Sequence, residues 1–138
     1  MWLARNAVQW VAVPDVPLDR SGRGEAQLIT RGVPYLREVW RGAHWRLYAV
    51  RSPTSLISGP ATLVRYGREG FTLRVHRPGR IMVRVHATRY WQVTGAKACV
   101  TATPDDWTVV HSRSRGIVRV RAAISARRLL TGRRSCRA

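Results

Sequence analysis

Apolar and polar residues alternate with a period of two through most of the second half of the chain. Residues 71–76 place every second side chain on an apolar face, and residues 81–86 repeat the pattern after a Pro-Gly turn. This alternation is typical of strands that cover a core with one face and meet water with the other. Short stretches bounded by turn residues predict further strands at 61–66, 90–93, 99–102, 107–111 and 116–124.

This series of short strands makes the expected fold mainly β, with an antiparallel β-sandwich over residues 57–125. The inward positions of the clearest strands define the core that we expect. Its members are Phe71, Leu73, Val75, Ile81, Val83, Val85, Val118 and Val120. Within each strand these residues are two positions apart and therefore lie on the same face. A shift of the strand register by one residue would expose all of them, so the pattern predicts that these side chains pack together in one core.

The first fifty residues predict a small αβ element that precedes the sandwich. Its expected parts are a strand at 8–13, a helix at 21–32 and a hairpin formed by 36–41 and 45–50. Ser21 is the expected helix N-cap, and Gly32 is the expected stop. If this element is the end of a larger domain, its outer face lacks cover and leaves Trp2, Trp10 or Trp40 partly exposed.

Two further segments have compositions unlike those of the strands. Residues 51–60 are rich in Ser, Pro and Gly and are the best linker candidate. Residues 126–138 form a basic tail, with five arginines after Ala126, that we expect to be disordered. No apolar run approaches the roughly 20 residues that a transmembrane helix requires.

The formal net charge of +18 raises the question of an anionic partner. All but one of the 25 basic residues are arginine, and they spread from Arg5 to Arg137. A high-GC coding sequence produces such a bias without selection for binding, and a phosphate-binding groove would concentrate its charges on one face. We therefore favour solvated strand faces, and we keep an Arg-rich nucleic-acid-binding protein as the alternative function.

The two cysteines, Cys99 and Cys136, do not make a disulfide framework. Cys99 lies in an apolar, strand-like stretch, whereas Cys136 lies in the basic tail. A bridge between them is possible, but the favoured interpretation is a buried small residue and an incidental thiol.

Catalytic residues, cofactor-binding residues and metal ligands are not expected. Among the seven acidic residues, Asp105 and Asp106 are adjacent in a predicted turn, and Asp15 and Asp19 flank Pro17 in a loop. The four histidines include His76 and His86, which we expect to lie on neighbouring strands of a hairpin. Two imidazoles could begin a zinc site, but no acid or cysteine is suitably spaced to complete it. The sequence therefore favours a protein that is not an enzyme.

Tryptophan is over-represented, with six residues, and an aromatic ring can stack on a sugar ring. The segment formed by Arg89, Tyr90, Trp91 and Gln92 combines two aromatic rings with hydrogen-bond donors. It is the candidate for glycan contact. The alternative, which short strands favour, is that Trp91 packs inside the sandwich.

Several short motifs resemble a region of large actinobacterial polytopic membrane proteins, which are glycosyltransferase-like or uncharacterised. Residues 7–21 contain a strand followed by a Pro-Asp-x-Pro-Leu-Asp turn. Residues 78–91 contain Pro-Gly, Val-Arg-Val and Tyr-Trp in that order, which is similar to a Pro-Gly … Arg-Val-Arg … Tyr-Trp signature of that family. A Gly-to-Cys segment at Gly95–Cys99 and a Trp-Thr-Val strand at Trp107–Val109 follow in the same order. The similar region in that family is an extracytoplasmic C-terminal domain.

This resemblance implies a non-catalytic extracytoplasmic accessory module of a cell-envelope, glycosyltransferase-like membrane protein, and this chain would be a fragment of it. Any catalytic role would belong to a membrane portion that these 138 residues do not contain. The implied location is the extracytoplasmic face of the cell membrane. The implied partners are that membrane portion or a cell-envelope glycan, and nucleic acid is the less favoured partner.

Overall fold

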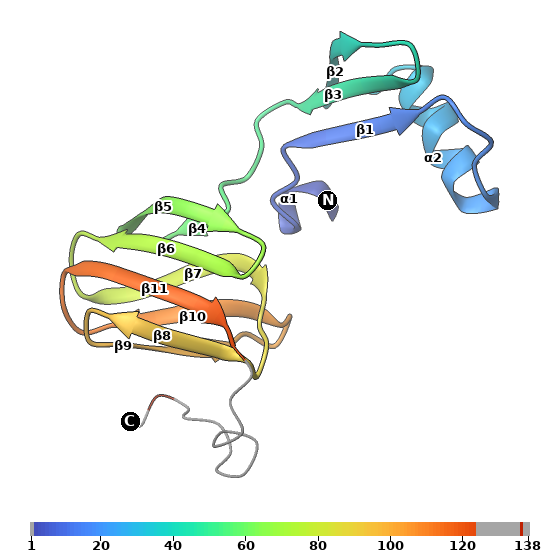
Figure 1. Ribbon diagram of the computed structural model, residues 1–138. Coiled ribbons are helices and arrows are strands. Elements are labelled where there is room, and N and C mark those ends of the chain that lie inside the picture. Colours follow the sequence, from blue (N-terminus) through green and yellow to red (C-terminus); the bar gives the residue numbers. More distant parts are fainter. Residues whose placement is uncertain (1, 124–135, 137–138) are drawn as a thin grey trace. The chain divides into compact units, whose positions relative to one another are not determined.

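A computed structural model describes residues 2–123 and residue 136 of the chain (Figure 1). The chain divides into two compact units, Met1–Ser55 and Leu56–Ala138, and the division falls inside the Ser- and Pro-rich segment 51–60. The fold is mostly β, with three antiparallel sheets and two short helices in the described residues.

The first unit is a three-stranded antiparallel sheet accompanied by the two helices. In chain order its elements are α1 (Trp2–Arg5), β1 (Trp10–Pro14), α2 (Arg20–Thr30), β2 (Leu36–Arg41) and β3 (Trp45–Val50). The strands lie in the order β1-β3-β2, so β3 is central. The β2–β3 hairpin has the bounds that the sequence predicts, because its alternating residues and its Gly-containing turn are local signals.

The N-cap of helix α2 is Asp19, two residues before the predicted Ser21, so the prediction of Ser21 as N-cap is wrong. Asp19 has the extended backbone of an N-cap, and its carboxylate accepts a hydrogen bond of 2.7 Å from the Gly22 N–H. The Ser21 hydroxyl donates to the same carboxylate at 2.9 Å. The hydrogen bond from Gly22, and then that from Ser21, lower the pKa of Asp19. At the other end, Gly32 has the positive φ (92°) of a helix stop.

The second unit is a β-sandwich of two four-stranded antiparallel sheets. Its strands are β4 (Ile57–Ser58), β5 (Ala61–Gly67), β6 (Gly70–Val75), β7 (Gly79–His86), β8 (Trp91–Gly95), β9 (Ala98–Ala102), β10 (Trp107–Ser112) and β11 (Gly116–Ala122). We call the sheet with order β4-β7-β10-β9 the β10 sheet. The sheet with order β5-β6-β11-β8 is the β11 sheet.

The core of the sandwich lies between these two sheets, and the predicted core is confirmed. The β11 sheet contributes Phe71, Leu73, Val75, Val118 and Val120. The β10 sheet contributes Ile81, Val83 and Val110, while Val85 is partly buried against the same cluster. Each predicted set alternates with exposed or half-buried residues, so the period of two does identify the buried face. Ala122, which the same pattern places inward, is exposed at the end of β11.

Consecutive strands β6 and β7 do not pair with each other, because the chain passes from one sheet to the other between them. The expected hairpin that would bring His76 close to His86 is therefore wrong. The predicted linker also contains a strand, since β4 pairs with β7 through Ile57 and Val83. The predicted tail at 126–138 lies outside the described residues except for Cys136.

Candidate functional site

The expected glycan-contact segment begins in the loop between β7 and β8, and its Trp91 turns into the sandwich. The Trp91 ring packs edge-on against Phe71, with ring centroids 5.8 Å apart. Its Nε1–H donates a hydrogen bond of 3.0 Å to the hydroxyl of Thr108, which is completely buried. The Thr108 hydroxyl in turn donates to the Val85 carbonyl at 2.8 Å. Trp91 thus joins the two sheets and is a packing residue first.

The other three residues of this segment form contacts of their own. The Arg89 guanidinium is 5.0 Å from the centroid of the Tyr90 ring and donates to the Tyr90 hydroxyl at 2.8 Å. Gln92 follows Trp91 in the strand and therefore faces outward, where its amide donates to the Ala123 carbonyl at 3.3 Å. Tyr90 contacts the same residue, because its carbonyl accepts a hydrogen bond of 3.1 Å from the Ala123 N–H.

The histidines and carboxylates of the described residues have separate, mainly structural contacts. His86 packs against Trp107 with ring centroids 4.5 Å apart, and His76 pairs with the Thr62 hydroxyl in the other sheet. Among described residues no three His, Cys, Asp or Glu side chains lie close enough to hold a metal ion. Asp106 has a positive φ (61°) in the β9–β10 turn, where its N–H donates to the Thr103 carbonyl.

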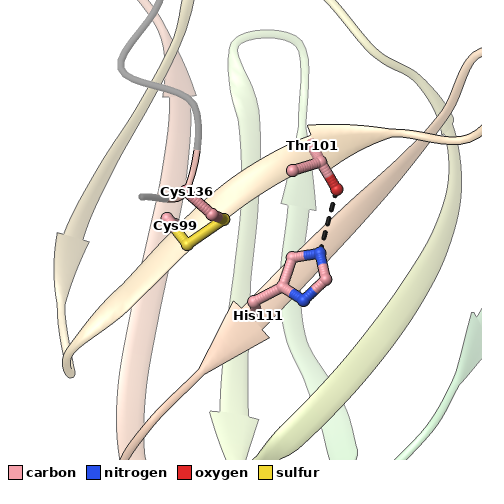
Figure 2. Close-up of a disulfide and its surroundings, with 4 residues drawn as sticks. All are labelled: Cys99, Thr101, His111 and Cys136. Carbon is pink, nitrogen blue, oxygen red and sulfur yellow. Dashed lines mark hydrogen bonds between the residues drawn. A yellow bond between two sulfur atoms is a disulfide. The ribbon is translucent and has the colours of Figure 1, made fainter. Parts of the chain in front are cut away.

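A disulfide joins Cys99 of β9 to Cys136, with 5.4 Å between the two Cα atoms (Figure 2). The favoured expectation of two unpaired cysteines is wrong. Cys99 is paired across the strands with His111, whose Nε2 lies 2.9 Å from the Thr101 hydroxyl. No local sequence signal reveals this bridge, because its two cysteines are 37 residues apart and one lies in the basic tail.

Four arginines gather on the outer face of the β11 sheet. This arginine face consists of Arg65, Arg74, Arg119 and Arg121, all of them exposed. Arg74 alternates with the buried residues of β6, and Arg119 and Arg121 alternate with those of β11, so all three point away from the core. Arg65 of β5 is paired with outward-facing Thr72, which places it on the same side.

The strand register brings these arginines close together. Thr72 is paired with Arg65 on one side and with Arg119 on the other, so the two arginines lie two strands apart. Neighbouring strands are about 4.8 Å apart, which separates these two Cα atoms by roughly 10 Å. Arg74 is a diagonal neighbour of Arg119 at about 7–8 Å, and Arg121 is two residues along the same strand. All four guanidinium groups can therefore reach one extended ligand.

The three-stranded sheet of the first unit has an exposed tryptophan face. Trp10 is paired with Ala49, Trp40 with Leu47 and Trp45 with Pro14, so all three indoles lie on one side of the sheet. Their exposed fractions are 57%, 55% and 49%. Trp2 of α1 is 69% exposed. The expectation that Trp2, Trp10 or Trp40 is partly exposed is therefore confirmed.

A groove of about 670 Å³ lies between α2 and the end of β1 in the first unit, and Trp45 is among the residues that line it. Arg23, Arg41 and Arg46 line it beside apolar residues such as Val13 and Leu18. Two of these arginines are already engaged: Arg23 donates to a backbone carbonyl, and Arg41 forms an ion pair of 2.8 Å with Glu38. That hydrogen bond is the main cause that lowers the pKa of Glu38. The groove is thus less available to an anion than the arginine face.

No helix among the described residues is long and apolar enough to span a membrane. Comparisons with protein-family models, with curated proteins and with solved structures gave no match for this chain.

Proposed function

We propose that this chain is a non-catalytic accessory module on the extracytoplasmic face of a cell membrane, acting with a glycosyltransferase-like membrane protein. The observation that carries the proposal is the Cys99–Cys136 disulfide. Disulfides form and persist in oxidising environments and are rare in the cytosol, where thiol-reducing systems keep cysteines reduced. The bridge thus supports the location that the resemblance of residues 7–21 and 78–91 implies.

The tryptophan face supports the role of an accessory module. Three half-exposed indoles on one side of a small sheet form a larger apolar area than an isolated surface residue does, and such areas mark contact sites. Trp10, Trp40 and Trp45 come from three different strands, so the area is continuous across the sheet. The membrane portion of a larger protein is the partner that fits an accessory role.

The positions of the carboxylates support a protein without catalytic activity. Asp19 caps α2, and Glu38 holds Arg41 through two hydrogen bonds of 2.8 and 3.1 Å. General acid–base catalysis requires a proton-transferring side chain within hydrogen-bond reach of the reacting group. Exposed Asp105 and Asp106 lie together in one turn, whereas a glycosidic bond would need a carboxylate on each side of a cleft.

Protease accessibility in intact cells tests the location. Cells that naturally produce the protein are treated with a protease that cannot cross the membrane, and the protein is followed with an antibody raised against it. We expect the protein to be degraded while a cytosolic marker remains intact. Protection of both proteins until the cells are lysed would place the chain inside and overturn the proposal.

Site-specific crosslinking tests the partner. A photo-crosslinking amino acid replaces Trp40 in the tryptophan face, and the control carries it at Arg68 in the β5–β6 turn. We expect the Trp40 variant alone to form an adduct whose mass spectrum contains peptides of a polytopic membrane protein. Adducts of equal yield from both positions, or none from Trp40, would contradict an accessory role. Turnover of an activated sugar donor by the purified protein would contradict the non-catalytic proposal.

A further inference from the structure

We propose that the arginine face of the β11 sheet binds an anionic glycan, a linear polymer with phosphate or carboxylate groups repeated along its backbone. The proposed function supplies only the compartment in which such a polymer occurs. The binding surface itself is argued from the positions of Arg65, Arg74, Arg119 and Arg121.

The fold concentrates positive charge on the arginine face. These arginines are scattered over 57 residues of sequence, yet the order β5-β6-β11-β8 collects them on one side of one sheet. The Cα separations of neighbouring members, roughly 7–10 Å, are comparable to the screening length of about 8 Å at physiological ionic strength. The four charges therefore act together on a nearby anion.

Carboxylates do not neutralise the four arginines of this face within residues 56–123. Within residues 56–123, none of the four arginines forms an ion pair with Asp or Glu. The carboxylates of that range are Glu69, in the β5–β6 turn beside this sheet, and Asp105 and Asp106 in the β9–β10 turn. Glu69 is thus the single acid of that range near the arginine face, and it forms no ion pair with any of the four arginines. The guanidinium groups are left with their forked donors directed to solvent, a geometry that matches phosphate and carboxylate oxygens.

Polar, uncharged residues lie between the arginines on this face. The outer face of the same sheet carries Thr62, Thr72, Thr94 and Gln92, which are paired with or adjacent to the arginines. Hydroxyl and amide groups both donate and accept hydrogen bonds, as the hydroxyl groups of a sugar do. A surface that mixes arginine with these residues suits a polymer that alternates charge with sugar hydroxyls.

The same face is poorly suited to nucleic acid. Single-stranded nucleic acid is held by aromatic rings on which the bases stack, and Trp91 of this sheet packs inward against Phe71. A duplex is read by a helix or a two-stranded ribbon that enters its groove, whereas this is one face of a four-stranded sheet. The arginines are matched to anions, and the Trp91 ring is not available as a platform for bases.

Binding to defined polymers tests the proposal with the purified full chain. The probes are poly(glycerol phosphate), polygalacturonate, neutral dextran, a single-stranded oligonucleotide and a duplex of matched charge, titrated at about 150 mM salt by calorimetry. We expect binding to one of the two anionic polymers, none to dextran, and weaker binding to both oligonucleotides. The affinity should fall steeply as salt rises.

Charge-matched variants then locate the site. Arg74→Gln with Arg119→Gln removes two charges from the arginine face, and Arg20→Gln with Arg51→Gln removes two exposed charges from the first unit. We expect at least a tenfold loss of affinity for the first pair and less than a twofold loss for the second. The charge-preserving pair Arg74→Lys with Arg119→Lys should lose less than the glutamine pair, and it serves as the test if the glutamine pair does not fold.

Three results would overturn the proposal. These are equal losses from the two glutamine pairs, tighter binding to either oligonucleotide than to both polymers, and no binding to either polymer. Because purified protein is used, the result is independent of the protease test of location. A protein that is extracytoplasmic but binds no polymer would refute this inference alone, and a cytosolic protein that binds one would refute the proposed function alone.

Discussion

Replacing Trp91 is expected to destabilise the sandwich, because its ring joins the two sheets. Trp91→Ala removes the edge contact with Phe71 and the hydrogen bond to Thr108. Truncation of a buried tryptophan costs about 3–5 kcal/mol of unfolding free energy. Because Trp91 is only partly buried, we expect a value near the lower end, about 3 kcal/mol.

A phenylalanine at the same position separates the ring contact from the hydrogen bond. Trp91→Phe keeps an aromatic edge near Phe71 but removes the donor to Thr108, and a neutral hydrogen bond contributes about 1 kcal/mol. For a domain of this size, 1 kcal/mol shifts the melting temperature by about 4–8 °C. We therefore expect Trp91→Ala to lower the melting temperature by roughly 12–24 °C, and Trp91→Phe by a clearly smaller amount.

Thermal unfolding followed by circular dichroism measures both variants, and Tyr66→Ala is the control in the same sheet. Tyr66 is 59% exposed, so its truncation should cost less than about 1 kcal/mol. If Trp91→Ala melts with the parent protein, the ring does not contribute to the core. That result would refute the packing role of Trp91 and favour its role in glycan contact.

Three further variants test other parts of the structure. Gly95→Ala should destabilise the sandwich strongly, because Gly95 has a φ of 101° and an added Cβ would lie 2.1 Å from a carbonyl oxygen of β11. Gly67→Ala has open space and should be tolerated, so equal melting temperatures for the two variants would refute the strand pairing at β8. Replacing Cys99 and Cys136 together by alanine should lower the free energy of unfolding by about 4 kcal/mol, because the disulfide closes a 37-residue loop and so reduces the entropy of the unfolded chain. Thermal or urea unfolding measures this loss. An apolar fluorescent dye should bind the native protein, and it should bind the Trp40→Gln variant less. No increase in dye fluorescence with the parent protein would contradict the exposure of the tryptophan face.

The sequence predicts the strands and the sandwich core well, because the signals are local. Whether Val118 or Arg119 faces inward depends on alternation within one strand, and the structure keeps that alternation. The helix cap was harder to predict, since Asp19 and Ser21 can both cap and only the backbone conformation decides between them. The pairing of strands is not local, and so the separation of His76 from His86 could not be read from the chain.

The same limit applies to the candidate site. Alternation places Arg74, Arg119 and Arg121 outward, but only the neighbouring positions of β6 and β11 reveal that these charges share one face. The disulfide likewise depends on the fold, which brings Cys136 within bonding distance of β9. For Trp91, the composition of its segment suggests a ligand surface, whereas the position of its ring between the sheets determines its packing role.

Trapping of thiols in the producing cells tests whether the Cys99–Cys136 disulfide is present in the cell. The cells are lysed in a denaturing buffer that contains iodoacetamide, and the mass of the intact protein is measured before and after reduction. We expect no alkylated cysteine before reduction and two afterwards, at Cys99 and Cys136. Two alkylated cysteines without reduction would contradict the disulfide in the cell, and with it the argument for an extracytoplasmic location.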